Sequence, residues 1–117
     1  MADQPAVPFR VSHSEQTRQL LKGWGVRARE LGLAAGYAAA LRFIEEKLQF
    51  DPLGWGDPLY QLHGLALKIF RGLHWSILVE YGVNEQERIV FIKKYELVLN
   101  NPLLLPTTPP NGNGTES

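Results

Sequence analysis

One stretch of the sequence gathers basic side chains and lacks acidic ones. Residues 58–79 contain no Asp or Glu, whereas Lys68, Arg71 and His74 all occur there. Such cations can stabilise the charge that develops on a phosphate under attack, and a histidine, with a pKa of about 6.5, can transfer a proton at neutral pH. The segment therefore indicates a local basic patch. The alternative is a buried part of a sheet from which acids are absent.

The signatures of other chemistries are missing. The sequence has no Walker loop, dinucleotide fingerprint, HExxH or GxSxG motif. It has no cysteine, and its three histidines are not spaced as metal ligands, so structural or surface roles are favoured for them. Glu45 and Glu46 are adjacent on a predicted helix, so their carboxylates point in different directions. We expect no metal and no cofactor.

The first half of the chain is predicted to form a helical hairpin. A short strand at residues 9–11 is followed by a capping box at residues 12–15, and the first helix ends at Gly32. The second helix, residues 34–50, ends where Asp51 precedes a proline. Its apolar stripe consists of Tyr37, Leu41, Ile44 and Leu48.

After a glycine- and proline-rich loop at residues 51–58, the apolar period changes to two. Trp55, between two glycines in this loop, is predicted to be exposed. Short turns at Arg71-Gly72 and at residues 84–87 predict a three-stranded antiparallel meander. The expected strands are residues 65–70, 74–83 and 88–95. One face of the second strand is predicted to carry Trp75, Ile77, Val79, Tyr81 and Val83. The continuous apolar run at residues 89–92 of the third strand predicts that this strand is covered on both faces.

These elements predict one α+β domain at residues 8–99, with flexible termini at residues 1–7 and 106–117. At 117 residues, the chain has room for one core but not for two. Its N-terminus does not resemble a signal peptide, and no apolar run is long enough to suggest a membrane span, so a cytoplasmic location is expected. Zero formal net charge argues against a broad phosphate-binding surface.

The order of these elements and two local sequences resemble the RelE/ParE superfamily of toxins. The resemblance covers residues 9–99. It is strongest in RFIEEKLQFDPLGWGDPLYQL at residues 42–62 and in VEYGVNEQERIVFIKK at residues 79–94. It implies a toxin of a type II toxin–antitoxin system, bound by a helical segment of its cognate antitoxin. Some members of this family cut mRNA in the ribosome, and others poison DNA gyrase.

The resemblance also implies where a ribonuclease site would lie. The RNA-cutting members use no metal and place Lys and Arg on the open face of the sheet, with a Tyr or similar group near the C-terminus. Leu78 stands where those members carry an arginine, which puts the activity in doubt. The candidate catalytic residues here are Lys68, Arg71, His74, Lys93 and Tyr95.

Three functions remain open at this point. The first is a metal-independent mRNA endoribonuclease, and the second is a toxin that acts by occupying a protein such as gyrase, or an inactive family member. The third is a housekeeping domain that only shares the architecture. An antitoxin gene beside this one would favour the first two over the third.

Overall fold

A computed structural model of the chain describes residues 7–104, in an α+β fold as predicted. The first half contains β1 (Arg10–Ser12), α1 (Glu15–Glu30), α2 (Ala34–Phe50) and the short helix α3 (Pro52–Trp55). The second half contains β2 (Asp57–Leu62), the 3₁₀ turn η1 (His63–Leu65), β3 (Leu67–His74), β4 (Ile77–Asn84), β5 (Ile89–Leu97) and the 3₁₀ turn η2 (Pro102–Leu104). The flexible termini predicted from the sequence lie outside the described residues, except for Val7.

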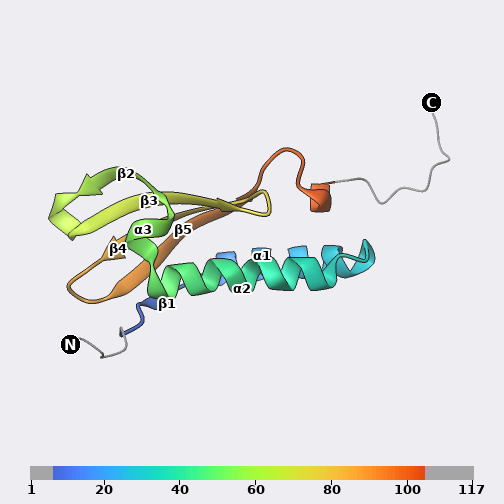
Figure 1. The fold of residues 1–117 in the computed structure, drawn as a ribbon, viewed down its shortest axis with the longest axis horizontal. Coiled ribbons are helices and arrows are strands. Elements are labelled where there is room, and N and C mark those ends of the chain that lie inside the picture. The colour runs from blue at the N-terminus through green and yellow to red at the C-terminus, as the bar shows by residue number, and fades with distance from the viewer. Residues whose placement is uncertain (1–6, 105–117) are drawn as a thin grey trace.

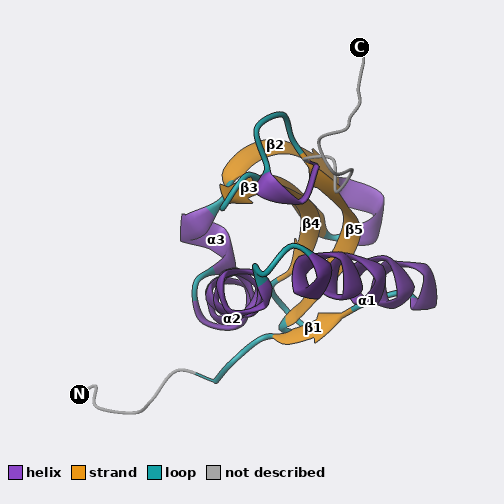
Figure 2. Ribbon diagram, turned by 90° about the vertical axis from the view of Figure 1, so that its right-hand side faces the viewer, coloured by secondary structure: helices purple, strands orange, loops and turns teal. Residues whose placement is uncertain are grey.

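The strands form one five-stranded sheet in the order β1-β5-β4-β3-β2. β1 runs parallel to β5, and every other neighbouring pair is antiparallel. The predicted meander is the β3-β4-β5 centre of this sheet, to which β1 and β2 add one strand at each edge. Helices α1 and α2 lie side by side against one face of the curved sheet (Figures 1 and 2).

The helix ends follow from local chemistry. The Oγ of Ser14 accepts a hydrogen bond from the backbone N–H of Thr17 at 3.1 Å, so Ser14 is the N-cap of α1. The predicted capping box at residues 12–15 was therefore wrong in register, because Ser12 belongs to β1. Gly32, with φ of 74°, follows α1 in the left-handed conformation that glycine tolerates. The bounds of α2 are those predicted from its apolar stripe.

The core lies between the two helices and the sheet. Ile44 and Leu48 of α2 are fully buried, and they belong to one cluster with Ile77, Val79 and Tyr81 of β4. The rings of Tyr37 and Trp75 also meet here, 6.3 Å apart between centroids. The predicted packing of the α2 stripe on this sheet face is confirmed.

The hairpin between β3 and β4 turns four residues later than predicted. Trp75 and Ser76 form the turn, with φ values of 55° and 53°. Gly72 lies inside β3 because the ring of Trp55 covers it: a Cβ at this position would lie 2.3 Å from that ring. Trp55 also stacks on Tyr81, with ring centroids 6.1 Å apart. The predicted turn at Arg71-Gly72 and the predicted exposure of Trp55 were therefore wrong.

One face of β5 is open, contrary to the prediction that residues 89–92 are covered on both faces. Val90 and Ile92 are buried against the helices, whereas Phe91 is 40% exposed on the other face. Within residues 7–104, no helix is long and apolar enough to cross a membrane.

Candidate functional site on the open face of the sheet

The strand alternation of β4 directs one acidic side chain away from the helices. Val79 and Tyr81 are fully buried on the helix side, so Glu80 between them points to the other side. Its neighbours in register are Arg71 of β3 and Lys94 of β5. We call this side of the sheet, which carries Arg71, Glu80, Lys93 and Lys94, the open face.

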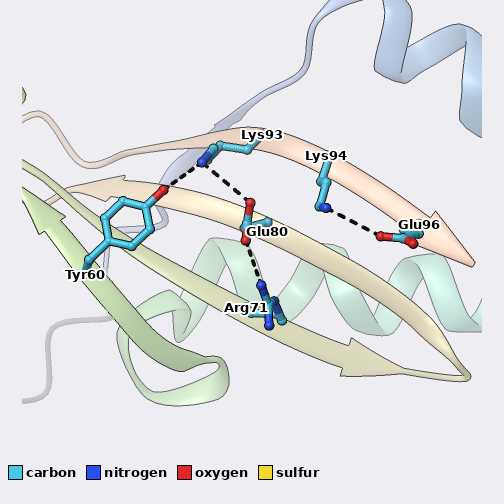
Figure 3. Close-up of polar contacts among 6 residues, drawn as sticks. All are labelled: Tyr60, Arg71, Glu80, Lys93, Lys94 and Glu96. Atoms are coloured by element: carbon cyan, nitrogen blue, oxygen red, sulfur yellow. Dashed lines mark hydrogen bonds and ion pairs between the residues drawn. The ribbon is translucent and has the colours of Figure 1, made fainter. Parts of the chain in front are cut away.

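Side chains from four strands meet on the open face (Figure 3). The Nη2 of Arg71 lies 3.2 Å from one carboxylate oxygen of Glu80, and the Nζ of Lys93 lies 3.5 Å from the other. Lys93 also donates a hydrogen bond to the hydroxyl of Tyr60 at 2.8 Å. We call Tyr60, Arg71, Glu80 and Lys93 the open-face cluster.

A β-bulge in β5 gives the open-face cluster its second cation. The register shifts between Glu80 and Tyr81, so that Glu80 pairs with Lys94 and Tyr81 pairs with Ile92. Lys93 is the extra residue, and its contacts with Glu80 place it on the same face as Lys94. Two consecutive lysines therefore face the same carboxylate, which regular alternation would forbid. Lys94 in turn lies 3.5 Å from the carboxylate of Glu96.

The charges of the open-face cluster hold each other ionised. Burial raises the pKa of the Glu80 carboxyl, but the hydrogen bond from Arg71 and the charge of Lys93 outweigh burial, so its pKa lies below the ordinary value. The hydrogen bond to Tyr60, together with the charge of Glu80, raises the pKa of Lys93 despite some desolvation. At neutral pH, the cluster presents one carboxylate between two cations.

The lowered pKa of Glu80 predicts a pH effect on stability. Because its folded-state pKa lies below the unfolded value of about 4.3, the carboxylate stabilises the fold above that pH. This contribution disappears as the pH falls through the folded-state pKa. Urea unfolding of wild type and Glu80→Gln should therefore differ most at neutral pH and converge in acid. The control is Glu96→Gln, whose side chain is 56% exposed. If the free energy of unfolding depended on pH equally in both variants, the lowered pKa assigned to Glu80 would be contradicted.

The structure brings together only two of the five candidate residues from the sequence. Arg71 and Lys93 meet through Glu80. Lys68 pairs with Glu85 at 2.6 Å. His74 and Tyr95 lie on the helix side of the sheet: His74 stacks on Phe43 of α2 with ring centroids 3.9 Å apart, and Tyr95 is 6% exposed. Burial raises the pKa of Tyr95, so its hydroxyl stays protonated.

Sequence reasoning missed Tyr60 and Glu80. Tyr60 follows the segment interpreted as a loop, and its ring reaches the site only because β2 pairs with β3. Glu80 could have been found from the sequence, because it is the first acidic residue after the acid-free stretch and it lies at an outward position of an alternating strand. Leu78, at the position where RNA-cutting members were expected to carry an arginine, precedes Glu80 on the same face of β4.

Other parts of the described structure have fewer features of a ligand site. Within residues 7–104, no group of three or more His, Cys, Asp or Glu side chains is placed to hold a metal ion. A shallow hollow of about 470 Å³ lies between β2 and β3, bordered by Tyr60 and Ile69. The open-face cluster is therefore the best candidate for chemistry in the described part of the chain.

Comparisons with known proteins define the class of fold. No protein-family model matches the sequence, and no curated protein sequence matches it. Among solved structures, a chain in the crystal structure of the toxin–antitoxin complex RelBE2 from Mycobacterium tuberculosis is similar, with a TM-score of 0.55 and 20% sequence identity. The similarity covers 84% of this chain and 100% of that chain. A helical hairpin packed on a mixed sheet is thus an architecture found in a toxin–antitoxin complex. The chain has a RelE-like fold, in agreement with the resemblance seen in its sequence.

Proposed function

We propose that this chain is the toxin of a toxin–antitoxin system and that it cleaves RNA on its open face. The observation that carries the proposal is the open-face cluster, where a carboxylate lies between two cations and one cation contacts a phenol hydroxyl. The similarity to a chain of the RelBE2 complex supports the toxin class. A proton acceptor, two anion-stabilising groups and a proton donor are the parts that RNA cleavage by its own 2′-hydroxyl requires.

In this proposal, Glu80 and Arg71 have one role each, and Lys93 has two. Glu80 accepts the proton of the 2′-hydroxyl, and the 2′-oxygen attacks the adjacent phosphorus. Arg71 and Lys93 stabilise the negative charge on the phosphorane. The bond from phosphorus to the 5′-oxygen breaks, and Lys93, which is protonated at neutral pH, donates a proton to that oxygen. The products are a 2′,3′-cyclic phosphate and a 5′-hydroxyl. This reaction uses side chains alone.

The partners follow from the same proposal. A toxin must be held inactive in its own cell, so a cognate antitoxin with a helical segment is the proposed protein partner, and the cytoplasm is the proposed location. The proposed substrate is mRNA, on the ribosome or free. The net charge of zero fits a toxin that contacts few phosphates itself.

A second candidate is a toxin that acts by occupying a protein such as DNA gyrase. The observation in its favour is apolar exposure beside the open-face cluster: Leu73 is 59% exposed, and its cross-strand neighbour Leu78 is partly exposed. Exposed apolar groups of this kind are used in protein recognition. This candidate predicts toxicity that does not depend on Glu80.

The test is induced expression of the protein alone in cells, with growth, mRNA ends and the DNA-damage response followed together. Wild type should arrest growth and produce new mRNA 5′-ends, and Glu80→Gln should do neither at equal protein level. Arrest by both proteins, with DNA damage and intact mRNA, would replace the ribonuclease with the gyrase-type toxin. Normal growth with wild type would contradict the toxin proposal as a whole.

A further inference from the structure

An exposed aromatic side chain lies in the row of the sheet next to the open-face cluster. Cross-strand pairing aligns Phe91 of β5 with Gly82 of β4, and Gly82 with Ile69 of β3. The neighbouring row, two residues along β4, contains Arg71 and Glu80. Two residues of a strand span about 7 Å. Phe91 lies two residues before Lys93 on the same strand, so its ring is separated from that cation by about the distance between a phosphate and the base of the same nucleotide.

Of the three residues in this row, only Phe91 is accessible, because Gly82 and Ile69 are buried. Gly82 contributes no side chain, and a Cβ at this position would lie 3.0 Å from the Cδ1 of Ile69. Ile69 itself is buried, with 1% exposure, whereas Phe91 is 40% exposed. The side chain of Ile69 thus lies over Gly82, and the ring of Phe91 is the accessible group at the β5 end of the row. A second exposed ring, that of Tyr60 at 46%, belongs to the β2 end of the same row, where Tyr60 pairs with Ile69, and its hydroxyl accepts a hydrogen bond from Lys93.

We infer that Phe91 is a positioning residue that stacks on a base of single-stranded RNA whose adjacent phosphate is held by Arg71 and Lys93. The inference rests on the proposed function and names its substrate class. With Lys94, which is paired with Glu96, this side of the sheet carries three cations against the two carboxylates of Glu80 and Glu96. This excess of positive charge suits a phosphate chain better than an apolar protein segment. Stacking tolerates any base, because every base has a π face. Phe91 should therefore contribute affinity without selecting sequence.

The test compares binding of two labelled 2′-O-methyl RNA oligonucleotides, which cannot be cleaved through the 2′-oxygen. One carries all its bases, and the other has the same backbone with abasic positions. Phe91→Ala should weaken binding of the first about tenfold, as expected for one lost stacking contact, and leave binding of the second unchanged. Phe91→Trp should restore binding, and RNA should quench its added fluorescence. The matched control is Leu73→Ala, an exposed apolar residue one row beyond Arg71 on the same face of β3.

Each outcome decides the inference. If Phe91→Ala binds both oligonucleotides like wild type, or if Leu73→Ala weakens binding equally, stacking on Phe91 is excluded. In that case, cleavage that still depends on Glu80 would leave the proposed function intact. If wild type binds neither oligonucleotide, the inference is also overturned, and a separate cleavage assay on ribosome-bound message decides whether the proposed function fails with it.

Discussion

Replacing Lys93 with methionine should lower the rate of RNA cleavage about 10²–10³-fold, because the phosphorane loses one of its two stabilising cations. Methionine keeps the unbranched stem and removes the charge. The Lys93 side chain is 42% exposed, so the free energy of unfolding should change little. The measurement is the cleavage rate at saturating enzyme, together with the thermal unfolding midpoint.

Lys68→Met is the matched variant for this experiment. Its side chain is 45% exposed and is paired with Glu85, away from the open-face cluster. Cleavage should continue at the wild-type rate in this variant. Loss of activity in Lys68→Met with retention in Lys93→Met would place the site where the acid-free sequence segment first indicated it, and would contradict the open-face cluster.

Replacing Ile44 with alanine should reduce the free energy of unfolding by about 2–5 kcal/mol. Ile44 is fully buried between α2 and the sheet, so truncation removes apolar contacts and leaves a cavity. Chemical denaturation monitored by tryptophan fluorescence measures the change. Val26→Ala is the control on α1, because Val26 is 45% exposed and alanine is the better helix former. Equal stability of the two variants would contradict the packing of α2 on the sheet.

The helices could be predicted from sequence because their signals are local. The stripe from Tyr37 to Leu48 and the Asp51-Pro52 step determine α2 without reference to any other element. The β3–β4 hairpin could not be placed in the same way. Its turn consists of Trp75 and Ser76, and neither residue type usually adopts a positive φ. Gly72 suggests a turn by its residue type, but a glycine is needed there because the ring of Trp55 packs against it.

The candidate site was only partly predictable for a related reason. Regular alternation along β5 would place Lys93 and Tyr95 on the same face. The bulge opposite Glu80 instead puts Lys93 and Lys94 on the open face and returns Tyr95 to the core. A bulge depends on the pairing of two strands and leaves no mark in either strand alone. The basic character of the site could therefore be predicted from the sequence, but the residues that form it could not.

The central claim is that RNA is cleaved by its own 2′-hydroxyl, with Glu80 as the proton acceptor. The most direct measurement is mass analysis of the RNA ends after incubation of the purified protein with ribosome-bound message. A matched message carries one 2′-deoxynucleotide at the main cleavage position. We predict 2′,3′-cyclic phosphate and 5′-hydroxyl ends from the first message and no cleavage at the substituted position of the second. Cleavage of the second message at the substituted position, ends bearing a 5′-phosphate, or no cleavage of either message would contradict the account.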